Sequence, residues 1–571
     1  MRHSFIYKTA RPWPNRRLKR AAIVGHVTPT TVRIWFRTSR PGSYCLMLWE
    51  AGSGEGRGRD AALREAFQEG PDLAFEEVRD LEGVRREAFD VLDWSRDTTA
   101  VLDLDGLVPG SEYGYALWSF DEGRVVVGQD RIGRSADGRR LHHAFRTLPL
   151  PSPTEPVTFG LYSCHRPYQD SLFGDARVGS MEIWYHFAAV LEQRREGVAY
   201  VLGGGDQVYC DGVGGLDIWK YLDGVMAVEG GEVAPSVDVM KSWYRDIFRG
   251  YWGFPSVQRV FARFPQYMIW DDHELGDGWG SHRLEDEDGL LKVLPSFARE
   301  GLSEEAAREL IARMGEAGFA VYDEYEHSHN PPTPEGRWDY SLQAGSTATY
   351  VLDGRGHRET SAGGATILGK PQMRRFKRWL EAVDPDRTPF VFVVSSVPVL
   401  HLSSMAANMD GLADHLPGGL GDDLRDSWEH SAHDIERKEL LDAVFAAAAR
   451  GLRPVFLSGD VHIAAAFRMQ RGAETVYQVT SSALSFSSTR STGWLLSSGV
   501  PDRTENSRDD YRFERLALYT EGNFGILTAE PAHAQVVFEL FGDQRVESPP
   551  GALASDRPVT LPIARIELGW G

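Results

Sequence analysis

Residues 198–209 read VAYVLGGGDQVY, and this stretch indicates the fold class of the larger part of the chain. Val198–Leu202 is a short apolar run bounded by glycines, which is typical of a fully buried β-strand. Three glycines and then Asp206 follow at once, so the Asp206 carboxylate is expected at the carboxyl end of that strand. In open α/β sheets, functional sites form at the carboxyl ends of the strands. The stretch therefore predicts an α/β sheet with a site at Asp206.

Three further apolar runs have the same construction, because each ends directly in polar side chains. They are Val157–Tyr162 followed by SCH at 163–165, Gln266–Trp270 followed by DDHE at 271–274, and Pro454–Leu457 followed by SGDVH at 458–462. Segments with helical spacing alternate with these runs, which is the mark of a parallel sheet. Four such strand ends side by side would bring Cys, Asp, Tyr and His side chains into one crevice. The series of four carries this prediction, since no single motif is strong.

The first 150 residues have a different pattern, with runs rich in β-forming residues and with Gly and Pro turns between them. The segment LVPGSEYGY at 107–115 resembles the Leu-x-Pro-Gly-x-x-Tyr pattern of fibronectin type III-like sandwiches. A Pro-rich stretch at 148–156 is typical of a linker. The predicted domains are an all-β sandwich at 1–150, an α/β domain at 155–545 with a helical insertion at about 280–335, and a C-terminal tail at 546–571.

The composition argues against several classes of function. A formal net charge of −20 does not suit a nucleic-acid scaffold, which needs a basic face, or adsorption to an anionic membrane. Three cysteines are too few for a disulfide framework, and no run approaches 18 apolar residues, so no membrane span is expected. The apolar run near the basic N-terminus is too short for a secretory signal, so a cytoplasmic protein is the default expectation. The oligomeric state is not predicted.

The donor atoms at the four strand ends indicate which metals fit. Tyrosinate and thiolate from Tyr209 and Cys164 suit an oxidised, strongly Lewis-acidic ion such as Fe³⁺. A second pocket rich in carboxylates suits a hard divalent ion, Ca²⁺, Mg²⁺ or Mn²⁺. Asp206 is the natural bridging ligand, because one carboxylate can serve two ions. Such a pair of ions lowers the pKa of a bound water and clamps a phosphoryl group for in-line attack.

Two sets of motifs resemble known families. Gly205-Asp206-x-x-Tyr209 resembles the same element in purple acid phosphatases. The segments WDDHE at 270–274 and SGDVH at 458–462, with Ser163-Cys164 ahead of them, resemble the PhoD-like alkaline phosphatases of the metallophosphoesterase superfamily. The resemblance covers roughly residues 155–545, and the preceding sandwich is similar to the N-terminal domain of those enzymes. It implies a four-layer α/β/β/α fold that acts on small-molecule phosphomonoesters or phosphodiesters. Relatives of this family are often exported.

The resemblance also implies ligands for an iron–calcium site, with Mn²⁺, Mg²⁺ or Zn²⁺ as other occupants. The residues that match iron ligands are Cys164, Asp206, Tyr209 and His462. The residues that match ligands of the second ion or ions are Asp206, Asp460 and one of Asp271 or Asp272.

The motifs depart from the generic superfamily pattern at four places. Ser163-Cys164-His165 stands where Asp-x-His is typical, and Asp271-Asp272 stands where many members have Gly-Asn before His-Glu. Ser396 replaces a superfamily histidine, and Asp277 lies near the position where PhoD-like enzymes often have Asn. These departures favour the PhoD-like branch. They leave the second-metal ligands open among Asp271, Asp272 and Asp277.

The remaining polar residues receive catalytic and substrate-binding roles. We expect His273 to protonate the leaving group, although it could also be a metal ligand or a core histidine. Its neighbour Asp272 is included with it among the catalytic candidates. Arg166, with His165 beside it, is a candidate for binding substrate phosphate, and an ordinary salt bridge is the other interpretation of Arg166.

Two other functions compete with a metal-dependent hydrolase. The first is a nucleophilic hydrolase that uses Cys164 and His165, but adjacent residues on a strand point to opposite faces. The second is a non-catalytic, metal-stabilised binding protein, although the mixed donors and several acids do not suit a closed tetrahedral site. Cys164 could also be an inert buried thiol, or could pair with Cys210 in a disulfide.

Overall fold

The computed structural model describes residues 18–51, 83–134, 140–170, 176–179, 181–212, 217–219, 221–222, 235–282, 284–285, 289–290, 293–294, 301–361, 364–401, 426–486, 503–506, 510–542 and 561–570. Residues 1–17 and 52–82 of the predicted sandwich, and residues 546–560 of the predicted tail, lie outside the described residues. Within the described residues, no helix is both long and apolar enough to cross a bilayer.

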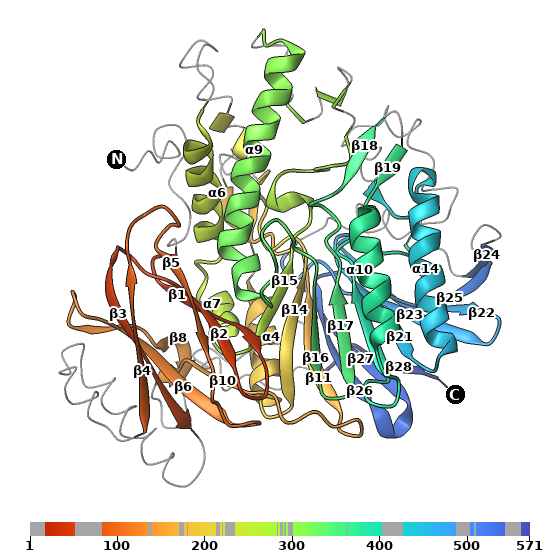
Figure 1. The fold of residues 1–571 in the computed structure, drawn as a ribbon, viewed down its shortest axis with the longest axis horizontal. Helices are drawn as coiled ribbons and strands as arrows, with labels where there is room; N and C mark the ends of the chain where they lie inside the picture. Colours follow the sequence, from red (N-terminus) through yellow and green to blue (C-terminus); the bar gives the residue numbers. More distant parts are fainter. Residues whose placement is uncertain are drawn as a thin grey trace.

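A six-stranded sheet contains three of the four apolar runs that precede polar residues (Figure 1). Its order is β15-β14-β11-β26-β27-β28, in which β11, β14 and β15 are parallel and the other neighbours are antiparallel. The strands are β11 (Val157–Tyr162), β14 (Val198–Gly204), β15 (Gln266–Ile269), β26 (Asn523–Glu530), β27 (Gln535–Gly542) and β28 (Ala564–Gly569). The sheet is completed by β28, so part of the predicted C-terminal tail is sheet.

An eight-stranded sheet contains the fourth run. Its order is β16-β17-β20-β21-β23-β22-β25-β24, and β17, β20, β21 and β23 are parallel. The strands are β16 (Tyr340–Ala344), β17 (Thr347–Val351), β20 (Phe390–Val394), β21 (Arg453–Ser458), β22 (Ala464–Arg471), β23 (Glu474–Thr480), β24 (Arg503–Asn506) and β25 (Tyr511–Tyr519). The parallel strands are nearly continuous apolar runs, as expected of strands that are buried on both faces.

The two large sheets share one apolar layer. Phe159 of β11 meets Phe392 of β20 with ring centroids 4.9 Å apart, and both side chains are fully buried. Leu161 and Leu457 lie in the same cluster. Burial of each such side chain contributes on the order of 1.5–3 kcal/mol. This layer keeps the carboxyl ends of strands from both sheets in a fixed relation to one another.

Helices cover the outer faces of both sheets. The outer face of the six-stranded sheet packs in one cluster with α4 (Glu182–Gln193), α6 (Val237–Tyr251), α7 (Pro255–Phe261) and α9 (Glu304–Tyr325). The outer face of the eight-stranded sheet packs with α10 (Gly369–Ala382) and α14 (Asp434–Ala449). The sequence prediction of a mixed α/β fold with several sheets is therefore confirmed. The helix α9 falls in the predicted insertion, yet its apolar face is part of this core.

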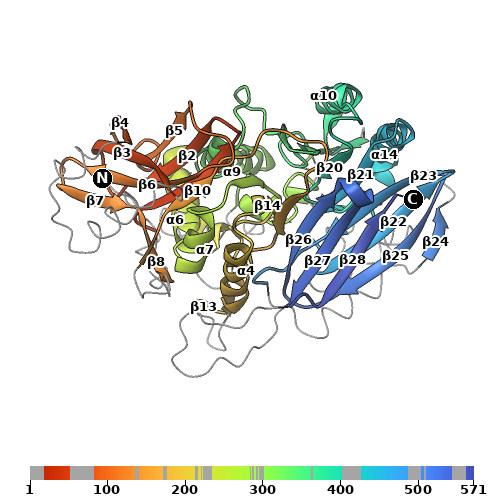
Figure 2. The same ribbon diagram turned by 90° about the horizontal axis from the view of Figure 1, so that it is seen from below.

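Two smaller antiparallel sheets precede the α/β part and lie at one end of the molecule (Figure 2). One contains β1 (Ala21–Val27), β2 (Val32–Arg37) and β5 (Thr99–Leu104). The other contains β3 (Gly42–Ala51), β4 (Val84–Val91), β6 (Glu112–Ser119), β7 (Arg124–Val127) and β10 (Ala144–Arg146). Phe36 of β2 and Tyr115 of β6 meet with ring centroids 6.2 Å apart, so the two sheets face one another. The fibronectin type III-like identity of this unit stays a prediction.

Buried polar contacts fasten the N-terminal sheets to the helices. Asp97 accepts two hydrogen bonds from the Arg37 guanidinium at 2.9 and 3.0 Å, and one from Arg249 of α6 at 3.2 Å. The Trp35 indole donates to the carbonyl oxygen of Glu324 in α9 at 2.8 Å. Because these groups are buried and paired, the N-terminal unit and the α/β part form one continuous interior.

Candidate metal centre

The loops after β11, β14, β15 and β21 meet at one end of the two large sheets. The Cys164 amide donates to the carbonyl of Gly205 at 3.3 Å, which joins the loops after β11 and β14. The Asp460 amide donates to Ser163 Oγ at 3.2 Å, which joins the loops after β21 and β11. The Cys210 amide donates to the carbonyl of His273 at 2.8 Å, which joins the loops after β14 and β15. The four strand ends predicted from sequence to converge therefore do so, through hydrogen bonds between their loops.

The backbone at these strand ends is strained at four positions. Cys164, Asp206, Asp460 and His462 all have a positive φ, between 57° and 62°. A side chain with a Cβ seldom adopts this left-handed conformation, which persists only where the surrounding structure enforces it. Each of the four residues was a candidate ligand in the sequence. Strain of this kind clusters at functional sites, and here it turns the side chains toward a common centre.

Three of the candidate ligands converge directly. Asp206 Oδ2 accepts from Cys164 Sγ at 3.3 Å and from the Tyr209 hydroxyl at 3.2 Å. All three side chains are buried. Burial raises the pKa of each of these groups, Cys164 raises the pKa of Asp206 further, and Asp206 raises the pKa of Tyr209 further. A nearby cation would favour the ionised forms, so the arrangement fits a multivalent ion that binds thiolate, carboxylate and phenolate.

His462 and Asp460 approach the same centre from β21. The His462 amide donates to Ser482 Oγ at 2.9 Å, and Cys164 Sγ lies 3.0 Å from the same hydroxyl. The His462 ring stacks on Phe486 at 3.7 Å, and burial lowers the pKa of His462 to about 3. The imidazole is therefore neutral, which is the form that binds metals. Burial, with Asp271 nearby, raises the pKa of Asp460 well above its usual range.

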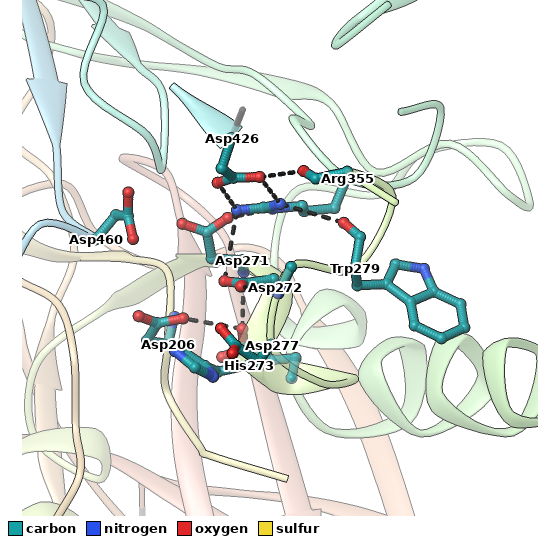
Figure 3. A network of polar contacts seen from close by, with 12 residues as sticks. Asp206, Asp271, Asp272, His273, Asp277, Trp279, Arg355, Asp426 and Asp460 are labelled. Atoms are coloured by element: carbon teal, nitrogen blue, oxygen red, sulfur yellow. Dashed lines mark hydrogen bonds and ion pairs between the residues drawn. The ribbon is translucent and has the colours of Figure 1, made fainter. Parts of the chain in front are cut away.

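The adjacent acids Asp271 and Asp272 have different surroundings. The Asp271 carboxylate pairs with the Arg355 guanidinium, which also donates two hydrogen bonds of 2.6 Å to Asp426. Figure 3 shows this guanidinium between the two carboxylates. Asp272 Oδ1 lies farther from the same guanidinium, at 3.4 Å, and Asp272 also belongs to a group with Asp206 and His273 whose ligand atoms are all within 4.8 Å of one another. Asp272 is therefore better placed than Asp271 to share an ion with Asp206.

His273 is held by an acid that the sequence did not single out. His273 Nδ1 lies 2.6 Å from Asp211 Oδ2, and the His273 ring stacks on Tyr209 at 4.1 Å. Asp211 also accepts from the Asp277 amide at 2.8 Å. Burial alone would lower the pKa of His273, but Asp211, Asp272 and Asp206 together raise it well above its usual value. The pairing with Asp211 therefore favours the protonated form of the His273 imidazole.

Arg166 lies beside this group, whereas His165 lies apart from it. The Arg166 guanidinium is over the rings of Tyr209 at 5.4 Å and of Phe486 at 5.0 Å. The His165 ring is buried, where Nδ1 lies 2.9 Å from Ser485 Oγ and Nε2 lies 3.1 Å from the carbonyl of Tyr251. Cys164 and His165 therefore have separate partners, so the geometry gives no support to a Cys–His nucleophile pair.

The three cysteines are free thiols in the structure, so Cys164 and Cys210 form no disulfide. Four residues of the site were not predicted from the sequence, namely Asp211, Glu274, Arg355 and Asp426. One signal could have found Arg355, because it follows β17 just as the other candidates follow their strands.

Large parts of the chain are similar to known proteins. A sequence model described as PhoD-like phosphatase matches residues 159–536. An uncharacterized protein of Saccharomyces cerevisiae is 23% identical over 386 residues, which cover 56% of this chain and 52% of the yeast protein. The chain therefore spans about half the length of that curated relative.

Two solved structures are similar to the chain. The structure of PhoD has a TM-score of 0.57 and 14% identity, with 93% of this chain and 87% of that chain covered. A purple acid phosphatase from yellow lupin (Lupinus luteus) seeds has a TM-score of 0.47 and 11% identity, with 94% and 74% covered. At this level of identity, the likeness to PhoD is a likeness of fold.

The different surroundings of Asp271 and Asp272 lead to a paired prediction. Asp272→Asn should weaken metal binding by about 10-fold or more, because it removes a charge that faces Asp206. Asp271→Asn should lower the melting temperature by leaving Arg355 with fewer counter-charges, and should change metal binding less. Metal analysis after dialysis, together with thermal melting of both variants, checks this. Equal metal loss in the two variants would contradict the distinction.

Proposed function

The chain belongs to the PhoD-like phosphatase family, and from this premise we propose that it is a metal-dependent phosphoric ester hydrolase. Its substrates are small-molecule phosphomonoesters or phosphodiesters. The observation that carries the proposal is the convergence of Cys164 and Tyr209 on one oxygen of Asp206, in a buried site with further acids beside it. A structural metal would need only one closed set of ligands.

Unpaired buried donor atoms support two ions that share Asp206. Asp206 Oδ1 and His462 Nδ1 are buried and have no hydrogen-bond partner among the described residues. One ion, proposed as Fe³⁺, would be held by Cys164, Asp206, Tyr209 and His462. The second, proposed as Ca²⁺, would be held by Asp206, Asp272 and Asp460. When bound, the two ions supply an activated water and neutralise the phosphoryl oxygens.

Side chains around the proposed metal site have further roles in the reaction. His273 holds a proton that it can donate to the leaving-group oxygen, and Asp211 fixes the imidazole through Nδ1. Arg166 keeps its guanidinium beside Tyr209, where it can donate hydrogen bonds to a phosphate oxygen. Asp271 acts through Arg355, which offsets one negative charge within a strongly acidic site.

The division into domains is part of the same proposal. We place a fibronectin type III-like sandwich at 1–150 and a four-layer α/β/β/α catalytic domain at 155–545. The buried contacts of Asp97 with Arg37 and Arg249 support a fixed position for the sandwich against helix α6. Its role is then to brace the catalytic domain.

The role of His273 as general acid can be tested by substitution. His273→Ala should slow alkyl phosphoesters, whose leaving groups need a proton, by about 10²–10⁴-fold, and should slow p-nitrophenyl esters far less. Measured kcat/KM for both substrate types, with metal content determined in parallel, checks this. Equal losses for both substrates together with metal loss would instead make His273 a ligand.

The pH dependence provides a second check on the same role. An acid works only while protonated, so its contribution is present below its pKa and disappears as the pH rises through that pKa. Asp211 raises the pKa of His273, so Asp211→Asn should move the alkaline limb of the kcat/KM profile to lower pH. An unmoved alkaline limb in Asp211→Asn would contradict the pairing of the two residues.

The identity of the ion near Tyr209 can be tested by its colour. Cys164, Asp206 and Tyr209 together supply about three negative charges, which match a trivalent ion and overload a divalent one. A phenolate bound to Fe³⁺ donates charge to the metal, so fully loaded protein should be coloured and dithionite should bleach it. Tyr209→Phe should shift or remove the absorption band, while Tyr251→Phe, a buried control, should not. Active, colourless protein without iron would refute the iron assignment alone.

A further inference from the structure

One buried carboxylate bonds to both loops that carry the proposed bridging site. Glu274 Oε1 accepts from the backbone amides of Gln207 at 2.5 Å and Val208 at 3.4 Å. Glu274 Oε2 accepts from the amides of Asp271 at 2.7 Å and Asp206 at 3.3 Å. The side chain is 1% exposed, so these bonds are not shared with solvent. Each oxygen makes its shortest bond to a different loop.

The loop after β14 has the shape of an anion-binding nest. Gly205 has φ 105° and Asp206 has φ 58°, and the amides of the next residues turn inward toward one point. Successive amides in such a conformation form a concavity that binds anions. Here the group that occupies the concavity is the carboxyl group of the chain's own Glu274. The strained backbone of Asp206 is thus held by hydrogen bonds to a side chain from another loop, which sets the direction of the Asp206 side chain.

Glu274 also accepts a hydrogen bond within its own loop, which follows β15. Asp272–Glu274 form a single 3₁₀ turn, η1, that Asp271 caps, and Glu274 completes a capping box by accepting the Asp271 amide. A capping box needs only that one bond from Glu274. The bonds to Gln207 and Val208 lie outside it, in a loop more than 60 residues away in sequence. They therefore require another explanation.

We propose that Glu274 is a positioning residue that locks the loop of Asp206 to the loop of Asp272. The inference rests on the proposed function, because it concerns two ions that share Asp206. With the loops fixed by separate oxygens of one carboxylate, Asp206 and Asp272 keep a constant separation. That separation determines whether one carboxylate can bridge two ions. The hydrogen bonds that Glu274 accepts all come from backbone amides, so its proposed action on the ions is through the positions of the two loops.

A second buried glutamate provides a matched control. Glu326 is 0% exposed, and neither of its oxygens has a hydrogen-bond partner among the described residues. It contributes no hydrogen bond to either ligand-bearing loop. Glu274 lies near enough to raise the pKa of Glu326, so Glu326→Gln removes a second buried acid from the same region while it leaves the hydrogen bonds of Glu274 in place.

The test uses the full-length protein, stripped of metal and titrated with Mn²⁺. Glu274→Gln keeps one acceptor oxygen but presents an NH₂ group to an amide donor, so it should release one loop from the other. We expect Mn²⁺ affinity to fall by about 10- to 100-fold, and the electron paramagnetic resonance signal of spin-coupled Mn²⁺ pairs to be lost. Glu274→Asp keeps the carboxyl group but is too short to reach both loops, and should behave in the same way. Glu326→Gln should match the wild type.

Three outcomes would contradict the inference, and they differ in whether the proposed function also fails. If the wild type binds no pair of metal ions, whether it is titrated with Mn²⁺ or with iron and Ca²⁺, the proposed function and this inference both fail. If the wild type binds a coupled pair and Glu274→Gln binds it equally well, only the inference fails. If both Glu274 variants fail to fold while Glu326→Gln folds, Glu274 belongs to the fold and not to the site, and the inference also fails.

Discussion

The repulsion among acids buried at one end of two sheets is the constraint on which the site depends. Asp206, Asp272 and Asp460 converge there, and Arg355 pairs with Asp271 beside them. Burial raises the pKa values of Asp206 and Asp460, so the protein alone favours their neutral forms. Bound cations, as proposed, would make the arrangement favourable as a set of anions. The free energy gained by packing the two sheets keeps these acids close together before any cation binds.

The scaffold meets that constraint with rigid elements and with local strain. Phe159 and Phe392 lock the two sheets face to face, so strand ends from both sheets keep their positions. At those ends, left-handed backbone at Cys164, Asp206 and two residues of the β21 loop turns donor atoms inward. Such backbone is costly, and it persists because hydrogen bonds between loops enforce it. The bonds of Glu274 to two loops are one example.

Sequence patterns were sufficient for the framework, because buried parallel strands are continuous apolar runs and their carboxyl ends are marked by abrupt polar residues. The structure brings the strand-end residues Cys164, Asp206 and Tyr209 together, and their roles as ligands stay a prediction. The pairings of Asp211 with His273 and of Asp426 with Arg355 could not be foreseen, since each joins distant segments. Likewise, the polar face of α9 led to its prediction as part of an insertion. The buried partners of the helix lie far away in the sequence, in α6 and in the N-terminal sheets.

The account makes Asp206 the shared ligand of two ions, and anomalous diffraction from crystals of the active protein tests this most directly. Data collected on both sides of the iron absorption edge should give two adjacent peaks, one on each side of the Asp206 carboxylate. The peak nearer Cys164 and Tyr209 should carry the iron signal. A single peak, or ions that do not contact Asp206 in protein that hydrolyses phosphoesters, would contradict the account.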